Sequence, residues 1–213
     1  MAWNSNLLTK RGMVYPPLFL FLLATSMLAG TSTYKLDFGT ATSPLADGFQ
    51  VGEAPSLQST CDPCFDVTDE KGGNPVTISF TGAIGAYSLG NAEKPLTTDG
   101  IYTFENKPDE PTNIEFTISC LPVGSLVTFY GMNAWNGDGR AAYLSFGDSG
   151  MVDLAGSTEP QAGATNFDAF ILVAAKQKVG ADGKLTGVFS NSDGSKSRAE
   201  GQWGGLVLVV ETP

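Results

Sequence analysis

The 213-residue sequence contains no histidine, and only 16% of its residues are charged. Histidine is the usual general base of serine hydrolases, a common metal ligand and the side chain that titrates near neutral pH. Its absence therefore argues against all three roles. After residue 30 the sequence also lacks a sustained helical period, and its 26 glycines favour short strands joined by turns.

Basic residues are scarce as well. The chain has 12 Lys and Arg against 22 Asp and Glu, a net charge of −10. Lys10 and Arg11 lie in the first thirty residues, where no acid occurs, so the remainder carries a net charge of −12. Such a body does not attract nucleic acid or anionic lipid headgroups. We therefore expect no nucleic-acid partner, and membrane contact only through residues 12–30 if these are not cleaved.

An uncharged run of nineteen residues, 12–30, follows those two basic residues. Its densest apolar part, Leu18–Leu28, is typical of a secretory signal, and Ala29 and Gly30 are small enough for cleavage. A helix of this length, at about 1.5 Å per residue, nearly spans a bilayer, which leaves an uncleaved anchor as the alternative. Two prolines near its start would kink that helix. Either way, the protein is expected outside the cytoplasm: periplasmic, secreted, or anchored on the outer face of the cytoplasmic membrane.

Period-two alternation of apolar and polar residues marks nine segments of the body. They are 34–39, 75–80, 100–104, 113–119, 125–131, 141–146, 167–175, 184–190 and 203–210. Asp-Gly turns separate many of them, and two longer connections span 52–74 and 147–166. The sequence thus predicts an all-β fold, an antiparallel β-sandwich or jelly roll of about nine strands over residues 31–213. The hydrophobic segment 1–30 precedes this single domain.

Three cysteines raise the question of metal or redox chemistry. Cys61 and Cys64 form a CxxC pair, but zinc would need a second pair, and no helical pattern follows as a thioredoxin-like site requires. In an oxidising compartment we expect a local disulfide between Cys61 and Cys64. Cys120 continues the alternation of Ile114, Phe116 and Ile118, so we expect it to face the core as a free thiol.

Ser149 lies in a Gly-Asp-Ser-Gly string of the kind that surrounds some hydrolase nucleophiles. A serine triad needs a base within hydrogen-bond reach, and nothing ties a lysine of this histidine-free chain to Ser149. Gly147 and Gly150 allow a tight turn in which Asp148 and Ser149 bond locally. We therefore interpret Ser149 as a turn residue and expect no enzymatic activity. The acidic residues carry no glycosidase signal, because 22 of them make plausible pairs by chance.

The best candidate for a ligand surface is the stretch 133–143. Trp135 is an aromatic platform in a connection, and amide, carboxylate and guanidinium groups flank it. The candidate ligand-binding residues are Trp135, Asn133, Asn136, Asp138 and Arg140. The alternative is that Trp135 closes the end of the core, as Trp203 in its strand is expected to do.

Calcium is the one metal that the sequence leaves open. Asp138, Asp182 and Asp193 lie in Asp-Gly turns, and oxygen-rich turns suit a hard cation. None of these turns has the staggered acids of an EF-hand loop, and Asp-Gly is first of all a hairpin signal. The metal site is therefore unassigned, and no other cofactor is expected.

Three stretches together resemble galactose-binding-like β-sandwich domains of secreted bacterial proteins, including the accessory domain of rhamnogalacturonan acetylesterases. They are YKLDFGTATSPLADGFQVG (34–52), IEFTISCLPVGSLVTFYGMNAW (114–135) and DGKLTGVFSNSDGSKSRAEGQWGGLVLVV (182–210). Cys120 falls where a glycine is common in that family. The resemblance implies a jelly roll, generally non-catalytic, that binds sugars or other partners through loops at one end, in some members with a structural calcium.

Composition and resemblance lead to one expectation and one alternative. We expect an exported, non-catalytic binding module for carbohydrate or a cell-surface partner. The alternative is a structural accessory subunit, docked through its sandwich edges on the outer face of a membrane complex and held by an uncleaved N-terminal segment.

Overall fold

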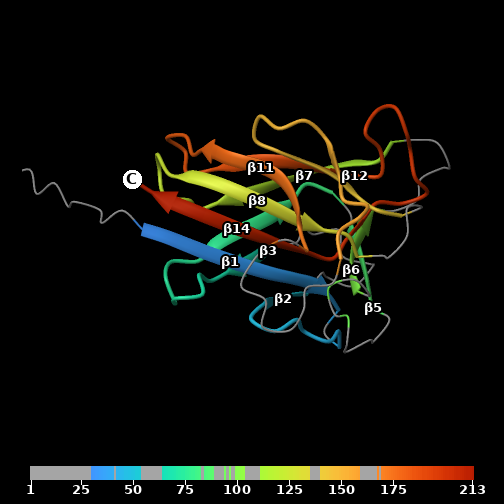
Figure 1. Ribbon diagram of the computed structural model, residues 1–213, viewed down its shortest axis with the longest axis horizontal. Coiled ribbons are helices and arrows are strands. Elements are labelled where there is room, and N and C mark those ends of the chain that lie inside the picture. Colours follow the sequence, from blue (N-terminus) through green and yellow to red (C-terminus); the bar gives the residue numbers. More distant parts are fainter. Residues whose placement is uncertain are drawn as a thin grey trace, which may run out of the picture.

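The computed structural model describes residues 30–40, 42–53, 64–82, 84–88, 94, 96, 99–103, 111–134, 140–158, 167 and 169–213. Strands β1–β14 in these ranges form three sheets (Figure 1). The predicted signal or anchor, apart from Gly30, lies outside the described residues. Among the residues described, no helix is long and apolar enough to cross a membrane.

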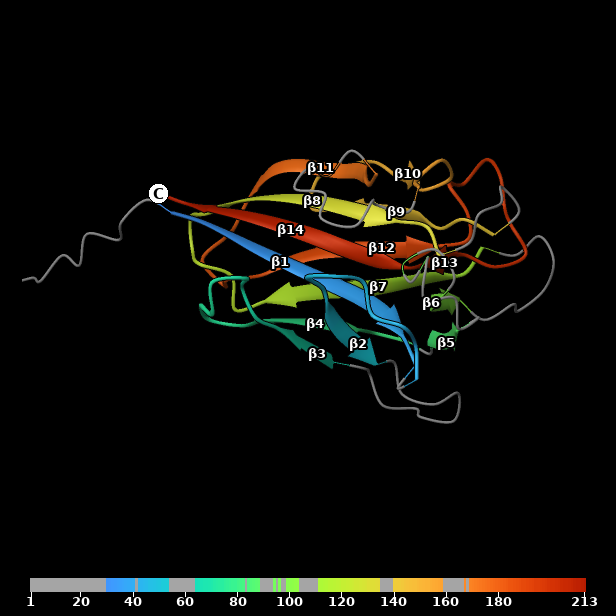
Figure 2. The same ribbon diagram turned by 60° about the horizontal axis from the view of Figure 1, so that its bottom comes forward.

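The larger two sheets are stacked on each other, as Figures 1 and 2 show from two sides. The 5-stranded sheet runs in the order β11 (Ile171–Lys178), β8 (Leu126–Met132), β14 (Gly205–Thr212), β1 (Gly30–Gly39) and β2 (Gln50–Glu53). The 6-stranded sheet runs in the order β10 (Val152–Asp153), β9 (Tyr143–Phe146), β12 (Leu185–Ser190), β7 (Asn113–Ser119), β4 (Val76–Phe80) and β3 (Cys64–Val67).

A 3-stranded sheet lies at one end of this sandwich (Figure 2). Its order is β13 (Gln202–Trp203), β6 (Asp99–Thr103) and β5 (Ile84–Ser88). In all three sheets neighbouring strands are antiparallel, with the exception of β1 and β2, which are parallel. The architecture is therefore a β-sandwich, which confirms the predicted fold class.

Side-chain alternation explains how the sheets enclose one core. In β7 the buried residues are Ile114, Phe116 and Ile118, and the residues between them are exposed or half-buried. Trp203 is fully buried at the centre of an aromatic cluster, where its indole Nε1 donates to the carbonyl of Gly205 at 2.8 Å. The expectation that Trp203 belongs to the core is thus confirmed.

The nine predicted segments correspond to β1, β4, β6, β7, β8, β9, β11, β12 and β14. The five further strands, β2, β3, β5, β10 and β13, have at most five residues each. The connection predicted at 52–74 contains β3, which begins at Cys64. β11 starts at Ile171 rather than 167, because Phe167 and Phe170 form a turn and pack on the outer face of the 5-stranded sheet.

Cys120 is exposed, so the prediction that it faces the core is wrong. β7 ends at Ser119, and Cys120 has φ 64°, in the left-handed region. This backbone turn takes the thiol out of the alternation, and Leu121 becomes the buried residue instead. Within the described residues, Lys176 is the one other non-glycine residue with a positive φ.

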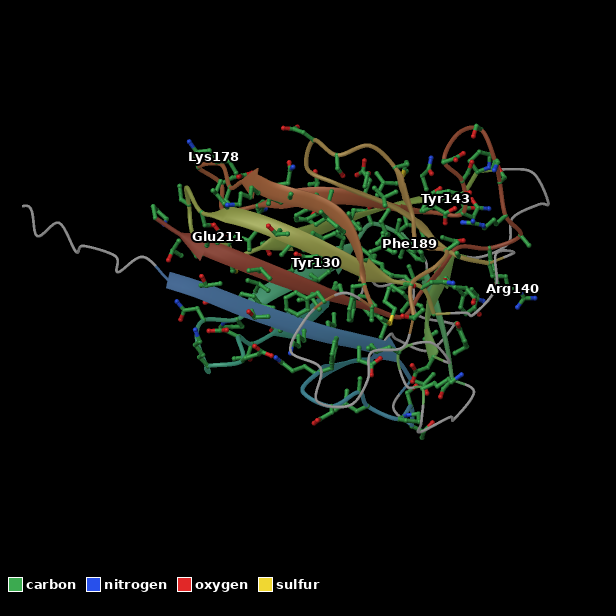
Figure 3. The ribbon with its side chains drawn as sticks, in the orientation of Figure 1. Tyr130, Arg140, Tyr143, Lys178, Phe189 and Glu211 are labelled. Carbon is green, nitrogen blue, oxygen red and sulfur yellow. The ribbon has the colours of Figure 1, made fainter. Side chains whose placement is uncertain are left out.

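The sandwich has two ends that differ in their connections. The terminus end comprises residues 30–33, 68–75, 120–125, 176–184 and 211–213; here Gly30 pairs with Thr212 and Leu126 with Lys178. The loop end comprises the 3-stranded sheet together with residues 133–134, 140–142 and 191–204. Figure 3 shows Lys178 and Glu211 near the first end and Arg140 and Tyr143 at the opposite one.

Candidate functional site

The structure describes two of the five predicted ligand-binding residues, and both lie at the loop end. Asn133 is buried, with 4% exposure, and its backbone N–H donates to Ser157 Oγ at 2.8 Å. Arg140 lies at the surface, with 51% of its side chain exposed (Figure 3). The two side chains are therefore not presented on one surface. Trp135, Asn136 and Asp138 lie outside the described residues.

Arg140 is the outermost member of a chain of polar contacts, which we call the loop-end network: Arg140, Glu200, Gln202 and Tyr87. The guanidinium Nη1 of Arg140 lies 3.1 Å from Glu200 Oε1, and Gln202 Nε2 donates to the same oxygen at 2.7 Å. The Tyr87 hydroxyl lies 3.0 Å from Gln202 Oε1 and 2.8 Å from the carbonyl oxygen of Ala134. The network thus runs from an exposed cation to the backbone at the base of the 135–139 connection.

The 3-stranded sheet brings these side chains together. Tyr87 comes from β5, and Gln202 comes from β13, where it pairs with Tyr102 of β6. Gly85 is opposite Tyr102 in the register, and a Cβ at Gly85 would lie 2.2 Å from the Tyr102 ring. Because glycine has no Cβ, that ring can lie across β5 beside Tyr87, with the ring centroids 6.1 Å apart.

Burial raises the pKa of Tyr87 far above its ordinary value, and the negative charges of Asp99 and Glu200 raise it further. The hydroxyl therefore stays protonated at any physiological pH and acts as a hydrogen-bond donor. Gln202 is buried, and its amide is bonded to Glu200 and Tyr87. Arg140 is the exposed member of the network, so the network can present a guanidinium cation to a ligand.

Arg198 connects the loop end to β9 and β10. Its guanidinium donates to both carboxylate oxygens of Asp153 at 2.9 and 2.8 Å and to the carbonyl of Ala141 at 2.9 Å. It also lies 4.4 Å from the centroid of the Tyr143 ring. Burial alone would raise the pKa of Asp153, but the hydrogen bonds and charge of Arg198, with the Ala155 N–H, hold that pKa below its usual value. Arg198 therefore fixes the backbone next to Arg140.

Ser149 occupies a tight turn after β9. Its Oγ accepts the Phe146 N–H at 2.8 Å, and its own N–H donates to the Phe146 carbonyl at 3.2 Å. Gly147 supplies the positive φ of this turn, and Asp148 N–H donates to Gln177 Oε1. These contacts agree with the interpretation of Ser149 as a turn residue.

The predicted calcium ligands that the structure describes lie in turns of their own. Asp193 accepts hydrogen bonds from the backbone of Ser195 and Lys196, and Asp182 accepts one from Lys184. Asp138 lies outside the described residues. Within the described ranges, no group of three or more acidic or cysteine residues is arranged to hold a metal ion.

The predicted disulfide stays a prediction. Cys61 lies outside the described residues, and Cys64 is described only as the first residue of β3.

The sequence analysis missed Tyr87, Glu200 and Gln202. Glu200 and Gln202 are two positions apart just before Trp203, a spacing that in an extended chain puts both side chains on the face opposite the indole. Tyr87 gives no comparable signal, because its partners are brought to it only by the pairing of β5 with β6.

Comparisons with known proteins return no match: no protein-family model fits the chain, and no curated protein or solved structure is significantly similar to it. The resemblance to galactose-binding-like domains therefore stays a prediction from sequence.

Proposed function

We propose that this protein is an exported, non-catalytic binding module that recognises carbohydrate through the loop end of its sandwich. The observation that carries the proposal is the loop-end network, in which an exposed Arg140 is held by Glu200 beside the connection that contains Trp135. Sugars are bound by fixed polar side chains that match their hydroxyl groups and by aromatic rings that pack against their apolar faces. The sequence and the network together supply both kinds of group.

The other parts of the proposal rest on the sequence. Export is inferred from the apolar run 12–30 behind two basic residues. A binding rather than catalytic role is inferred from the absence of histidine and from the local hydrogen bonds of Ser149.

The alternative, an accessory subunit that docks through its sandwich edges, is less well supported. Edge docking requires a strand whose backbone can pair with another chain. At one edge of the 5-stranded sheet, the Gln50 side chain exchanges hydrogen bonds with the backbone N–H and C=O of Thr68. At the other edge, β11 has two register shifts and a positive φ at Lys176. Irregular or covered edges discourage such pairing.

A glycan array probed with the full chain tests the proposal. We expect binding to one class of glycan, lost in Trp135→Ala and weakened about tenfold or more in Arg140→Gln, since a charged hydrogen bond contributes about 1.5–3 kcal/mol. Lys184→Gln is the matched control, because it removes a cation from the terminus end and should bind as the parent protein does. Absence of glycan binding, or equal binding by all four proteins, would contradict the proposal.

A further inference from the structure

The outer face of the 5-stranded sheet carries a second hydrophobic cluster, separate from the core between the sheets. In β8, Val127 and Phe129 point into the core, whereas Tyr130 and Met132 belong to the outer cluster. Figure 3 shows Tyr130 over the middle of this sheet. The half-buried members of the outer cluster, which reach the surface, are Phe49, Tyr130, Phe167, Ala169 and Val209.

The outer face of the 6-stranded sheet is different. Ile78 of β4 and Ile118 of β7 are buried in the core, and the residues that alternate with them carry short hydroxyl side chains. The register brings these hydroxyl residues together on one face: Thr77, Ser79, Thr117, Ser119 and Thr186. A solvent-facing sheet of this protein therefore does not need aromatic rings, and their presence on the other sheet calls for a reason.

The strand register places Tyr130 in a row of side chains that crosses the 5-stranded sheet. Tyr130 lies opposite Leu172 of β11 and Val207 of β14, and Val207 lies opposite Lys35 of β1. Directly opposed residues have neighbouring side chains. Leu172, with 49% exposure, ends the row at the edge of the sheet.

Phe167 and Phe49 complete this row around Lys35. The Phe167 ring lies 5.2 Å from the Tyr130 ring, between centroids, and the Lys35 ammonium lies 6.0 Å from the Phe167 centroid and 5.8 Å from that of Phe49. Such contacts of an ammonium with aromatic rings hold the cation in place. We call this set the aromatic row: Leu172, Tyr130, Phe167, Lys35 and Phe49.

The aromatic row is bordered by a charged pair. Lys35 pairs with Glu70, and 18% and 42% of their side chains are exposed. The two charges offset each other, so the pair does not select an ion of one sign, but it supplies a hydrogen-bond donor and an acceptor side by side. Within the described residues the Tyr130 hydroxyl makes no hydrogen bond, so it is available to a ligand.

Sugars match both parts of this surface. Their apolar C–H faces pack on aromatic rings, and their hydroxyl groups both donate and accept hydrogen bonds. An apolar surface, such as a second copy of the chain packed on Leu172 and Tyr130, would instead have to remove the Lys35–Glu70 pair from water, which is costly. The chemistry of the row therefore favours a sugar over an apolar partner.

We propose that the aromatic row is a second carbohydrate site, which binds a chain of pyranose residues across the outer face of the 5-stranded sheet. This site uses no residue of the loop end, so it goes beyond the proposed function and holds whether or not the loop end binds sugar. A sheet face surrounds less of a ligand than a pocket does. We expect a Kd of about 1 mM, too weak for a washed glycan array to retain the complex.

Nuclear magnetic resonance of the full chain, with 13C-labelled Leu and Val methyl groups, tests the proposal. The chain is titrated separately with hexasaccharides of glucose, xylose, mannose and galactose. We expect at least one of them to shift the methyl signals of Leu172 and Val209 and to leave unchanged those of Val188, on the outer face of the 6-stranded sheet. No shift at Leu172 with any hexasaccharide, or equal shifts at Val188, would overturn the proposal. Leu172 signals that change on dilution without sugar would assign this face to a second copy, and would overturn it as well.

Variants of the row separate this site from the loop end. Tyr130→Ala should weaken the binding at least about fivefold, because the ring contact is lost, whereas Tyr130→Phe should retain most of it. Glu70→Ala removes an exposed acceptor and should weaken binding at least about threefold, which keeps a test available if Tyr130→Ala does not fold.

Two controls should bind as the parent protein does. Val188→Ala truncates a half-buried side chain on the opposite sheet, and Trp135→Ala alters the loop end. If Tyr130→Ala and Glu70→Ala bound as tightly as the parent, or if Trp135→Ala abolished the shift at Leu172, the aromatic row would not be the site. Because the array measures the loop end and these titrations measure the sheet face, either proposal can fail without the other.

Discussion

Both ends have main-chain hydrogen bonds between their connections, but their side-chain contacts are arranged differently. At the terminus end, main-chain bonds of 2.9–3.1 Å link Val179 with Ser125, Gly124 with Val179 and Leu121 with Gly183, and side-chain contacts such as Lys176 with Glu211 form separate pairs. The loop end also has main-chain bonds, such as that from the Ala142 N–H to the Gln202 carbonyl at 3.1 Å. It adds a group of side-chain contacts through Arg198, Glu200, Gln202 and Tyr87. Substitution of these side chains is therefore expected to disturb the loop end, as at a site of specific recognition.

The largest expected effect comes from adding a side chain at Gly204, where backbone segments of the loop end lie in close contact. A Cβ at Gly204 would lie 1.9 Å from the carbonyl oxygen of Leu96 and 3.1 Å from Ala134 Cα. Gly204→Ala should therefore lower the free energy of unfolding by about 3 kcal/mol or more, because a backbone atom cannot move aside as a side chain can. Urea denaturation followed by circular dichroism measures this.

Gly150→Ala is the matched control for that substitution. A Cβ at Gly150 meets nothing within 4 Å, and its φ is not in the left-handed region. Its free energy of unfolding should stay within about 0.5 kcal/mol of the parent value. Similar losses in both variants would mean that the close contact at Gly204 does not exist.

The next prediction compares a buried set of side-chain contacts at the loop end with an exposed ion pair at the terminus end. Arg198→Met removes two charged hydrogen bonds to Asp153 and one to Ala141, from a side chain that is only 11% exposed. We expect a loss of about 2–3 kcal/mol in the free energy of unfolding. Lys176→Met, at the terminus end, breaks an exposed pair with Glu211 of 3.6 Å and should cost at most about 0.5 kcal/mol. Equal losses would show that side chains hold both ends.

Arg198→Met also tests how the stability of the protein depends on pH. The pKa of Asp153 is lower in the folded protein than its ordinary value, so its contribution to stability is present above about pH 4 and is lost as the pH falls through the folded pKa. Arg198→Met should flatten the decline of stability in this acidic range. If stability declined as steeply in Arg198→Met as in the parent protein, carboxylates other than Asp153 would be responsible for the decline.

Alternation of apolar residues in the sequence predicted nine of the strands, and β7 shows the pattern most clearly, with Ile114, Phe116 and Ile118 buried. It missed β13, because Gln202 and Trp203 form a strand only through pairing with Tyr102 and Ile101 of β6. The same limit applies to the site. Arg140 was found from the composition of its own loop, whereas Tyr87 and Gln202, 115 positions apart, meet only after the sheet has formed.

Cys120 provides the smallest effect and the sharpest check of the terminus end. Its φ of 64° is costly for a residue with a Cβ, and its side chain is exposed, so substitution loses no core contact. Cys120→Gly should raise the free energy of unfolding by about 0.5–1 kcal/mol, since relief of backbone strain exceeds the larger entropy of glycine in the unfolded chain. Cys120→Ala keeps the Cβ and should give no gain in the same urea titration. If alanine stabilised the protein as much as glycine, the thiol rather than the backbone would be the cause. A gain for glycine alone would show that this end is shaped by its main chain.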